Sequence, residues 1–452
     1  MPIASPTGRR AALEGRLRQV RSRFTALGAE TGPPARAAEW LLDNAHLVLG
    51  ALRQVGEDLP KGFVRSLPVT REGELRVAGL ARQAAAGPGS LDLDRIRRAV
   101  EGFQEEIPLT LGELWALPAL LRLEAVESLV HAAEQLLAGT APGGGEGEAE
   151  RIAAAVLILR ALSAADWRPF VESVSRVEQE LRRDPAGVYA RMDFATRDLY
   201  RKEVERLARG SRATEEEVAR AAVLLAGEAE DGDARRRHAG HFLIGGGRPA
   251  LERRIGFRPS WRARPGRWVR RHATPAYLGS VTLATLTATL LPVAWAASLG
   301  VSLPQLAVLG ALLLVPAGTV AVSLINAFVT LSLAPRALPR MGFEDDLPDG
   351  CRTLVVVPAM LTSEDEVLSL LAGLEVRFLG NSGKNLGFAL LSDWGDAPAR
   401  EMPGDAALLT LAADGIRELD ARLRGEDGVP RFFLLHRERR WNPGEGVWMG
   451  WE

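Results

Sequence analysis

The chain has 452 residues, of which 25% are charged, and its 56 basic and 57 acidic residues leave a net charge of −1. This near balance argues against nucleic-acid binding, which needs a basic surface. A single cysteine, Cys351, excludes a disulfide framework and fits a reducing compartment, and the first residues lack the apolar core of a secretory signal.

Residues 1–250 are predicted to form a helical region. Apolar residues recur there every three to four positions, which is the period of an amphipathic helix. The segments with this period are 12–27, 37–55, 111–137, 152–162, 171–181 and 196–207. Thr214 and Glu217 form a capping box for a further helix to about residue 226, and 227–247 is predicted to be a loop. The glycine-rich residues 139–150 predict a flexible break between two helical halves.

A long uncharged segment follows. From His272 to Pro335, 64 consecutive residues include no Asp, Glu, Lys or Arg. About 20 apolar residues cross the hydrocarbon core of a bilayer, so this length is sufficient for two transmembrane helices. Gly300 and Pro304 interrupt the segment, which predicts helices at about 276–299 and 305–333 in a hairpin that occupies 276–334. The alternative is a very hydrophobic buried hairpin in a soluble protein.

The residues that flank the hairpin are basic. The juxtamembrane linker before the hairpin, 251–275, carries Arg253, Arg254, Arg258, Arg262, Arg264, Arg267, Arg270 and Arg271. Arg336 and Arg340 follow the hairpin. Basic flanks stay in the cytoplasm, so we expect both termini to be cytoplasmic and the short turn to face outward. The linker is expected to contact anionic headgroups of the lipid bilayer, unless it is only a solvated connection. Pro292, Pro316 and Asn326 are predicted to mark a kink or a polar contact between the helices.

The pattern changes in residues 351–452. Short β-branched or apolar runs at 352–358, 386–391 and 431–435 predict buried strands. Helices are predicted between them, at 363–379, opened by a Ser363–Glu366 capping box, and at 405–423. Strand and helix alternate as in half of a doubly wound α/β domain with a parallel sheet. Because the chain ends soon after the third strand, we expect this domain to be truncated.

Three segments follow the predicted strands, at the sheet edge where ligands bind in open α/β folds. The first, 358–364, contains Thr362 and Glu364 and offers backbone groups to a base and a helix N-terminus to an anion. In the second, Asp393 is placed to accept hydrogen bonds from a ribose or a base. The third contains Arg439 and Arg440, whose guanidinium groups suit a pyrophosphate. The alternatives are a capping or loop role for Asp393 and a solvated pair for the two arginines.

Other acidic and histidine motifs are weaker. Asp92 and Asp94 have the spacing of a metal-holding pair but are surrounded by arginines in a helical region. His238 and His241 have no neighbouring cysteine or carboxylate cluster that would complete a zinc site. We therefore predict no metal site in this sequence, and its residues assemble no Ser-His-Asp or Cys-His set, so no catalytic residue is predicted from them.

Several longer motifs resemble the N-terminal portion of the bacterial cyclic β-1,2-glucan synthases. They include an early helix (PARAAEWLLDNAH) at 34–46, a run at 182–198 (RRDPAGVYARMDFATRD), GHFLI at 240–244, CRTLVVVP at 351–358 and FALLSD at 388–393. The most specific is the run at 436–452, HRERRWNPGEGVWMGWE. The likeness extends over nearly the whole chain.

The resemblance implies a processive, multi-pass glucosyltransferase of the bacterial inner membrane. Such enzymes transfer glucose from UDP-glucose to a growing β-1,2-glucan and close it into a ring. The resemblance also implies that 351–452 is the N-terminal part of a domain with the GT-A type of nucleotide-sugar fold. Asp393 then matches the first aspartate of the nucleotide pocket, and the turn at 358–364 would face the uracil.

This sequence departs from the family in length. Family members are several times longer, and their elements for the divalent metal (Mg or Mn), the catalytic base and the acceptor site have no match here. The resemblance therefore implies a fragment that binds no metal, is inactive alone and has the remainder of its own synthase chain as a partner. The competing hypothesis is a non-catalytic, membrane-tethered helical scaffold with a degenerate nucleotide-binding fold.

Overall fold

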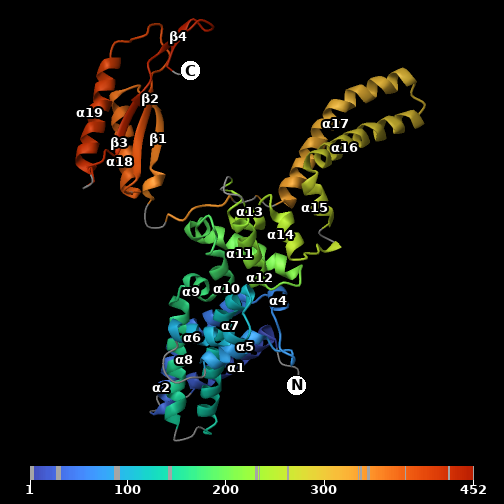
Figure 1. Cartoon of the computed structure of the whole chain (residues 1–452), viewed down its shortest axis with the longest axis vertical. Coiled ribbons are helices and arrows are strands. Elements are labelled where there is room, and N and C mark those ends of the chain that lie inside the picture. The colour runs from blue at the N-terminus through green and yellow to red at the C-terminus, as the bar shows by residue number, and fades with distance from the viewer. Residues whose placement is uncertain are drawn as a thin grey trace. The chain divides into compact units, whose positions relative to one another are not determined.

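The computed structural model describes residues 5–26, 32–85, 92–140, 145–229, 233, 235–261, 264–333, 335, 338–343, 347–381, 383–425 and 428–450. The chain forms two compact units, Met1–Arg340 and Met341–Glu452 (Figure 1). Parts of the predicted break (141–144) and of the predicted loop at 227–247 (230–232 and 234) lie outside the described residues.

The first unit begins with a helical bundle around one hydrophobic core. Its helices are α1 (Pro6–Ala26), α2 (Pro33–Asp43), α3 (Ala45–Asp58), α4 (Lys61–Val64), α5 (Arg76–Ala85), α6 (Leu93–Glu106), α7 (Leu111–Leu137), α8 (Glu146–Ala164) and α9 (Trp167–Val174). Helix α7 is the centre of this bundle, because it is apolar around most of its circumference and packs against α1, α3, α5 and α8. A capping box of Thr110 and Glu113 fixes its first turn.

A second, smaller core follows. It is built from α10 (Arg176–Leu181), the 3-10 turn η2 (Tyr189–Arg191), α11 (Phe194–Arg209), α12 (Glu215–Gly227), α13 (Ala239–Leu243) and α14 (Arg248–Arg254). Buried charges in it are paired, as burial requires. The Tyr189 hydroxyl donates to Glu178 at 2.6 Å, and Arg201 donates to Glu178 at 2.9 Å and to Glu172 at 2.8 Å.

The helical prediction differs from the structure in its boundaries. The segment predicted at 37–55 is two helices separated at Asn44, and the one at 171–181 is two helices separated at Ser175, whose hydroxyl caps α10. The two cores also meet near Ser175, whereas the predicted break at 139–150 joins α7 and α8, which pack against each other. The helices α4, α5, α6, α13, α14 and α15 (Arg264–Arg271) were not predicted.

The hairpin is formed by α16 (Ala273–Ser298) and α17 (Leu303–Ser332), which lie antiparallel in Figure 1 after the short helix α15 (Arg264–Arg271). Both long helices have the length and composition of membrane spans. Only 6% and 11% of their most apolar windows are buried, whereas a soluble core hairpin would be mostly buried. Tyr277 donates to Asn326 at 2.9 Å, which confirms a polar contact between the two helices.

The segment after the hairpin returns to the helical region. The Asp193 N–H donates to the Arg340 carbonyl at 3.1 Å, and the Arg340 N–H donates to the Thr196 hydroxyl at 2.9 Å. These two bonds attach the segment to the first turn of α11, which Asp193 caps. The chain after α17 is therefore fixed to the helical core before the second unit begins.

The second unit has the predicted order of strand and helix. After the short turn η4 (Asp349–Cys351) come β1 (Thr353–Met360), α18 (Glu364–Gly380), β2 (Leu386–Asp393), α19 (Asp405–Leu423) and β3 (Phe432–His436). The three strands are parallel in the order β1-β2-β3. Figure 1 shows α18 and α19 beside this sheet.

Both helices of this unit share one core with one sheet face. Phe388, Leu390 and Phe432 point into that core, where residues of α18 and α19 cover them. The opposite face carries Leu354 and Phe433, which remain 44% and 38% exposed. The structure thus shows a small three-stranded parallel sheet with helices on one face, which is a coarser description than the GT-A type of domain that the resemblance implies.

Candidate functional site

The carboxyl ends of the three strands bring the predicted site segments together. Met360 pairs in register with Asp393, and Ser392 with His436. The Leu361 N–H donates to the Asp393 carbonyl at 3.0 Å, and the Arg437 N–H to the Ser392 carbonyl at 3.0 Å. All three loops thus start from one edge, where ligands bind in sheets of this kind.

Asp393 is the last residue of β2 and is not a free acceptor. Its two carboxylate oxygens accept bonds from Nε and Nη2 of Arg437, each at 2.7 Å. This bidentate geometry is the strong form of an arginine–carboxylate pair. The Asp393 side chain is 14% exposed and that of Arg437 is 48% exposed, so water reaches the pair from the arginine side. Sequence reasoning found Asp393 but missed Arg437 as its partner.

Arg439 differs from both sequence interpretations, the phosphate clamp and the solvated pair. It is 6% exposed, and its guanidinium donates to the Gly395 carbonyl at 2.7 Å, to the Arg400 carbonyl at 3.2 Å and to the Asp405 carboxylate. It also lies over the Trp394 ring, 5.3 Å from the centroid. Arg439 therefore ties the loop after β2 to the segment after β3.

The electrostatics of Asp405 fit this role. Burial alone would raise the pKa of Asp405, but the Arg439 guanidinium and the Met402 N–H outweigh it and the pKa is lower than usual. The carboxylate is thus ionised at neutral pH. The ion pair with Arg439 is present throughout the physiological range.

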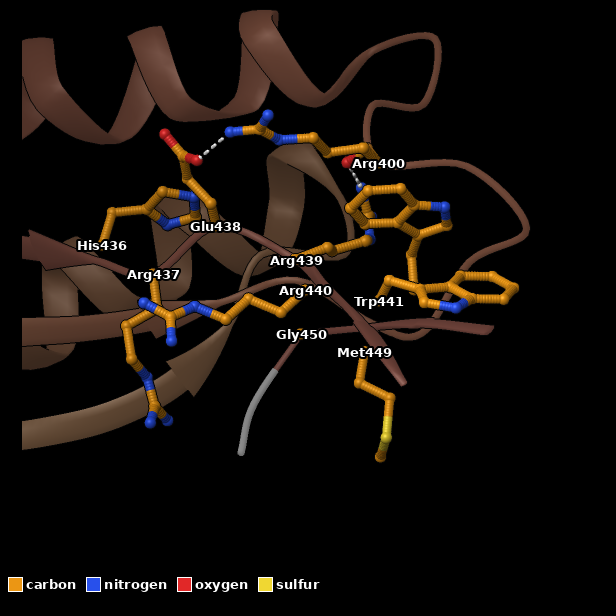
Figure 2. A pocket seen from close by; sticks show the side chains of 10 residues that line it. Arg400, His436, Arg437, Glu438, Arg439, Arg440, Trp441, Met449 and Gly450 are labelled. Carbon is orange, nitrogen blue, oxygen red and sulfur yellow. Dashed lines mark hydrogen bonds and ion pairs between the residues drawn. The ribbon is translucent and has the colours of Figure 1, made fainter. Parts of the chain in front are cut away.

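Arg440 behaves differently from its neighbour. Its side chain is exposed and has no hydrogen-bond or ion-pair partner among the described residues. It lines a hollow of about 750 Å³ together with Arg400, His436, Arg437, Glu438, Arg439, Trp441, Trp448, Met449 and Gly450. Figure 2 shows Arg437 and Arg440 pointing toward one side of this hollow and Trp441 toward the other. Arg400 pairs with Glu438 and Arg437 with Asp393, whereas Arg440 forms no ion pair of its own among the described residues.

His436 also lines the hollow. Its Nδ1 lies 2.9 Å from the Ser392 hydroxyl, while its Nε2 is buried and has no hydrogen-bond partner in the described part of the chain. Burial lowers the pKa of His436, against the opposing effect of Asp393. The ring is therefore neutral at pH 7.

The two residues predicted in the first loop do not join this hollow. Thr362 is exposed, next to the Leu361 bond to Asp393. Glu364 opens α18 and lines a separate, shallow surface with residues of α19, including Thr410 and Asp414. The structure therefore places Arg439 and Arg440 at the hollow, connects Asp393 to it only through Arg437, keeps Thr362 near the sheet edge, and directs Glu364 elsewhere.

Sequence reasoning also missed a β-hairpin. Strands β4 (Arg440–Asn442) and β5 (Val447–Met449) pair antiparallel, with Trp441 opposite Trp448. Ala397 and Trp448 exchange two backbone hydrogen bonds, at 2.9 and 3.0 Å, which dock the hairpin on the loop after β2. The signal was available, because the glycines in the 443–446 turn and the flanking tryptophans are typical of a hairpin.

The described residues do not fit a metal centre. They contain no group of three or more His, Cys, Asp or Glu that could hold an ion. Asp92 caps α6 by accepting the Arg95 N–H at 2.7 Å. His238 is held by Asp184 at 2.8 Å and by the Tyr200 hydroxyl at 3.0 Å.

Comparison with known proteins agrees with the resemblance seen in the sequence. No protein-family model matches the chain. The cyclic β-(1,2)-glucan synthase NdvB of Rhizobium meliloti (strain 1021) is 34% identical to it over 95% of this chain. The chain spans 18% of the length of that relative. The resemblance to a cyclic β-1,2-glucan synthase is therefore confirmed for almost the whole chain.

Proposed function

We propose that this chain, as a homologue of part of a cyclic β-1,2-glucan synthase, is a segment of an inner-membrane hexosyltransferase that uses UDP-glucose. The observation that carries the proposal is the 34% identity over 95% of the chain to the cyclic β-(1,2)-glucan synthase NdvB. The arginine-rich hollow at the carboxyl edge of a parallel sheet supports it, since nucleotides bind at such edges.

In this proposal the chain holds the nucleotide and does not complete the reaction. Arg440, which has no partner among the described residues, receives the diphosphate first. Arg437 then exchanges its bond to Asp393 for a phosphate oxygen, because a guanidinium fork fits phosphate as well as carboxylate. Asp393, once released, accepts hydrogen bonds from the uracil or ribose, with Thr362 beside it.

The rest of the proposed activity depends on a longer chain. The hairpin of α16 and α17 would span the bacterial inner membrane with both flanks cytoplasmic. The divalent metal, the catalytic base and the growing glucan would be held by the remainder of the synthase. Residues 1–452 alone are therefore proposed to incorporate no glucose.

The test is a calorimetric titration of the purified, detergent-solubilised chain with UDP, uridine and UDP-glucose. We expect saturable binding of UDP that weakens in Arg440→Gln, by roughly 10- to 150-fold if a charged hydrogen bond of about 1.5–3 kcal/mol is lost. Uridine binding should not change, because Arg440 would contact phosphate only. The matched control is Arg417→Gln, an exposed arginine of α19 that pairs with Asp414. Equal UDP affinity in the wild type and Arg440→Gln would contradict the proposed site.

A second candidate is the non-catalytic scaffold. It is favoured because Asp393 pairs with Arg437 and Arg439 pairs with Asp405. Two of the five predicted ligand residues therefore already have a partner within the chain. In a scaffold these pairs are permanent, and neither UDP nor uridine binds. The same titration separates the two functions, since absence of heat with all three ligands supports the scaffold.

A further inference from the structure

Helix α15 has two chemically different faces. At 100° per residue, Arg264, Arg267, Arg270 and Arg271 lie on one arc, and Pro265, Trp268 and Val269 lie on the other. Trp268 is 60% exposed and Val269 is 46% exposed, so the apolar arc is largely uncovered by the described chain. A clean amphipathic helix with an exposed tryptophan indicates an external apolar phase.

The charges around α15 are one-sided. No Asp or Glu occurs from residue 253 to residue 343. Arg267 is engaged by Glu252 of α14, with bonds of 2.6 and 3.0 Å. Arg264, Arg270 and Arg271 have no carboxylate partner among the described residues. The basic arc therefore carries three charges that are available to an anionic surface.

The position of α15 decides what that surface is. His272, with φ −120° and ψ 46°, breaks the helix between α15 and the long apolar helix α16, so the chain can change direction there. A helix that lies along a membrane surface before a spanning helix needs such a break. In this arrangement the Trp268 ring would lie at the membrane–water interface, at the depth that tryptophans in membrane proteins prefer.

We propose that α15 is an interfacial helix that lies in the headgroup layer of a bilayer containing anionic lipid. Trp268 and Val269 insert at the acyl boundary, and Arg264, Arg270 and Arg271 contact headgroup phosphates. This inference rests on the proposed membrane position of α16 and α17. It adds a consequence: the Arg267–Glu252 pair connects the interfacial helix to α14, whose Leu251 is buried in the second core, and so fixes the helical region to the membrane surface.

The single exposed cysteine makes a direct experiment possible. In a Cys351→Ser background, the full chain carries an environment-sensitive fluorophore at Val269→Cys, at Leu290→Cys in α16 or at Val69→Cys. Val69 is the matched control, being 58% exposed in the helical region far from the hairpin in sequence. The labelled proteins are reconstituted in phosphatidylcholine vesicles with or without phosphatidylglycerol, and quenching by doxyl lipid is compared with quenching by iodide.

We expect the Val269 label to be quenched by doxyl lipid and shielded from iodide only when phosphatidylglycerol is present. Each arginine near an anionic surface contributes roughly fivefold to binding, so replacing Arg264, Arg270 and Arg271 by Gln should shift the equilibrium roughly 100-fold toward release. A Val269 label as open to iodide as the Val69 label, or one indifferent to phosphatidylglycerol, would overturn the inference. If the Leu290 label also escapes doxyl quenching, the membrane hairpin itself is wrong. Quenching at Leu290 without quenching at Val269 refutes only the role of α15.

Discussion

Arg439→Lys should loosen the docking of the β4–β5 hairpin without unfolding the sheet. The guanidinium bonds two carbonyls and one carboxylate, and lysine can keep only the contact with Asp405. Hydrogen bonds to charged groups contribute about 1.5–3 kcal/mol each. Because the bond to Arg400 is long at 3.2 Å and water can replace part of the loss, we expect a cost of about 2–4 kcal/mol.

Hydrogen exchange measures this loss at the amides that tie the loop to the hairpin. The amides of Ala397 and Trp448 donate to each other's carbonyls and should exchange roughly 30- to 800-fold faster in Arg439→Lys, since about 1.4 kcal/mol is tenfold. The matched control is Arg440→Lys, one residue away and without a partner among the described residues. Exchange that accelerates equally in both variants, or in neither, would refute the assignment of Arg439 as an internal tie.

Two further predictions concern the first unit. Burial raises the pKa of Glu215 to about 7, against the Leu111 N–H that it accepts. The folded state then keeps a proton that the unfolded chain has lost above its usual pKa of 4.5, so stability should fall as pH rises from about 4.5 to 7 and level off above. Urea unfolding at several pH values should show this decrease in the free energy of unfolding, of at most about 3 kcal/mol in total, in the wild type and not in Glu215→Gln. An equal pH dependence in the two proteins would contradict the prediction. Separately, a reporter enzyme fused at Gly300, in the uncharged turn, should lie outside the cytoplasm, and one fused after β2 should lie inside; a cytoplasmic signal at Gly300 would exclude the two-span hairpin.

Long elements with an unmistakable period were predictable from the sequence. The predicted bounds of α7 and α19 coincide with the structure, and both transmembrane candidates lie within a few residues of their predicted ends. These elements are decided by local composition, either a continuous apolar surface or a strong 3.6-residue repeat. Short helices such as α13 and α14 are decided by what packs on them, which a local pattern does not contain.

The sheet edge that carries the candidate site was predictable from the sequence, and the pairing of its side chains was not. Strand ends fixed the edge at which Asp393 would lie, because parallel strands place their carboxyl ends together. Which arginine would meet which acceptor depended on the path of the loops after β2 and β3. Arg437, adjacent to the strand end, reaches Asp393, and Arg439 turns inward to Asp405. Neither pairing has a signature in a run of basic residues.

Removing the Asp393 carboxylate should weaken binding of the nucleoside half of the nucleotide and strengthen binding of its diphosphate half. If Asp393 binds the nucleoside, Asp393→Ala leaves ligand donors unpaired, at a cost of about 1–3 kcal/mol or roughly 5- to 150-fold in uridine affinity. The same substitution frees the half-exposed Arg437, so pyrophosphate should bind more tightly than to the wild type. Titrations with uridine and with pyrophosphate test the two effects separately, with Asp414→Ala on the exposed side of α19 as the control. Affinities that fall together would indicate a disrupted edge, and affinities that do not change would make Asp393 a purely structural partner of Arg437.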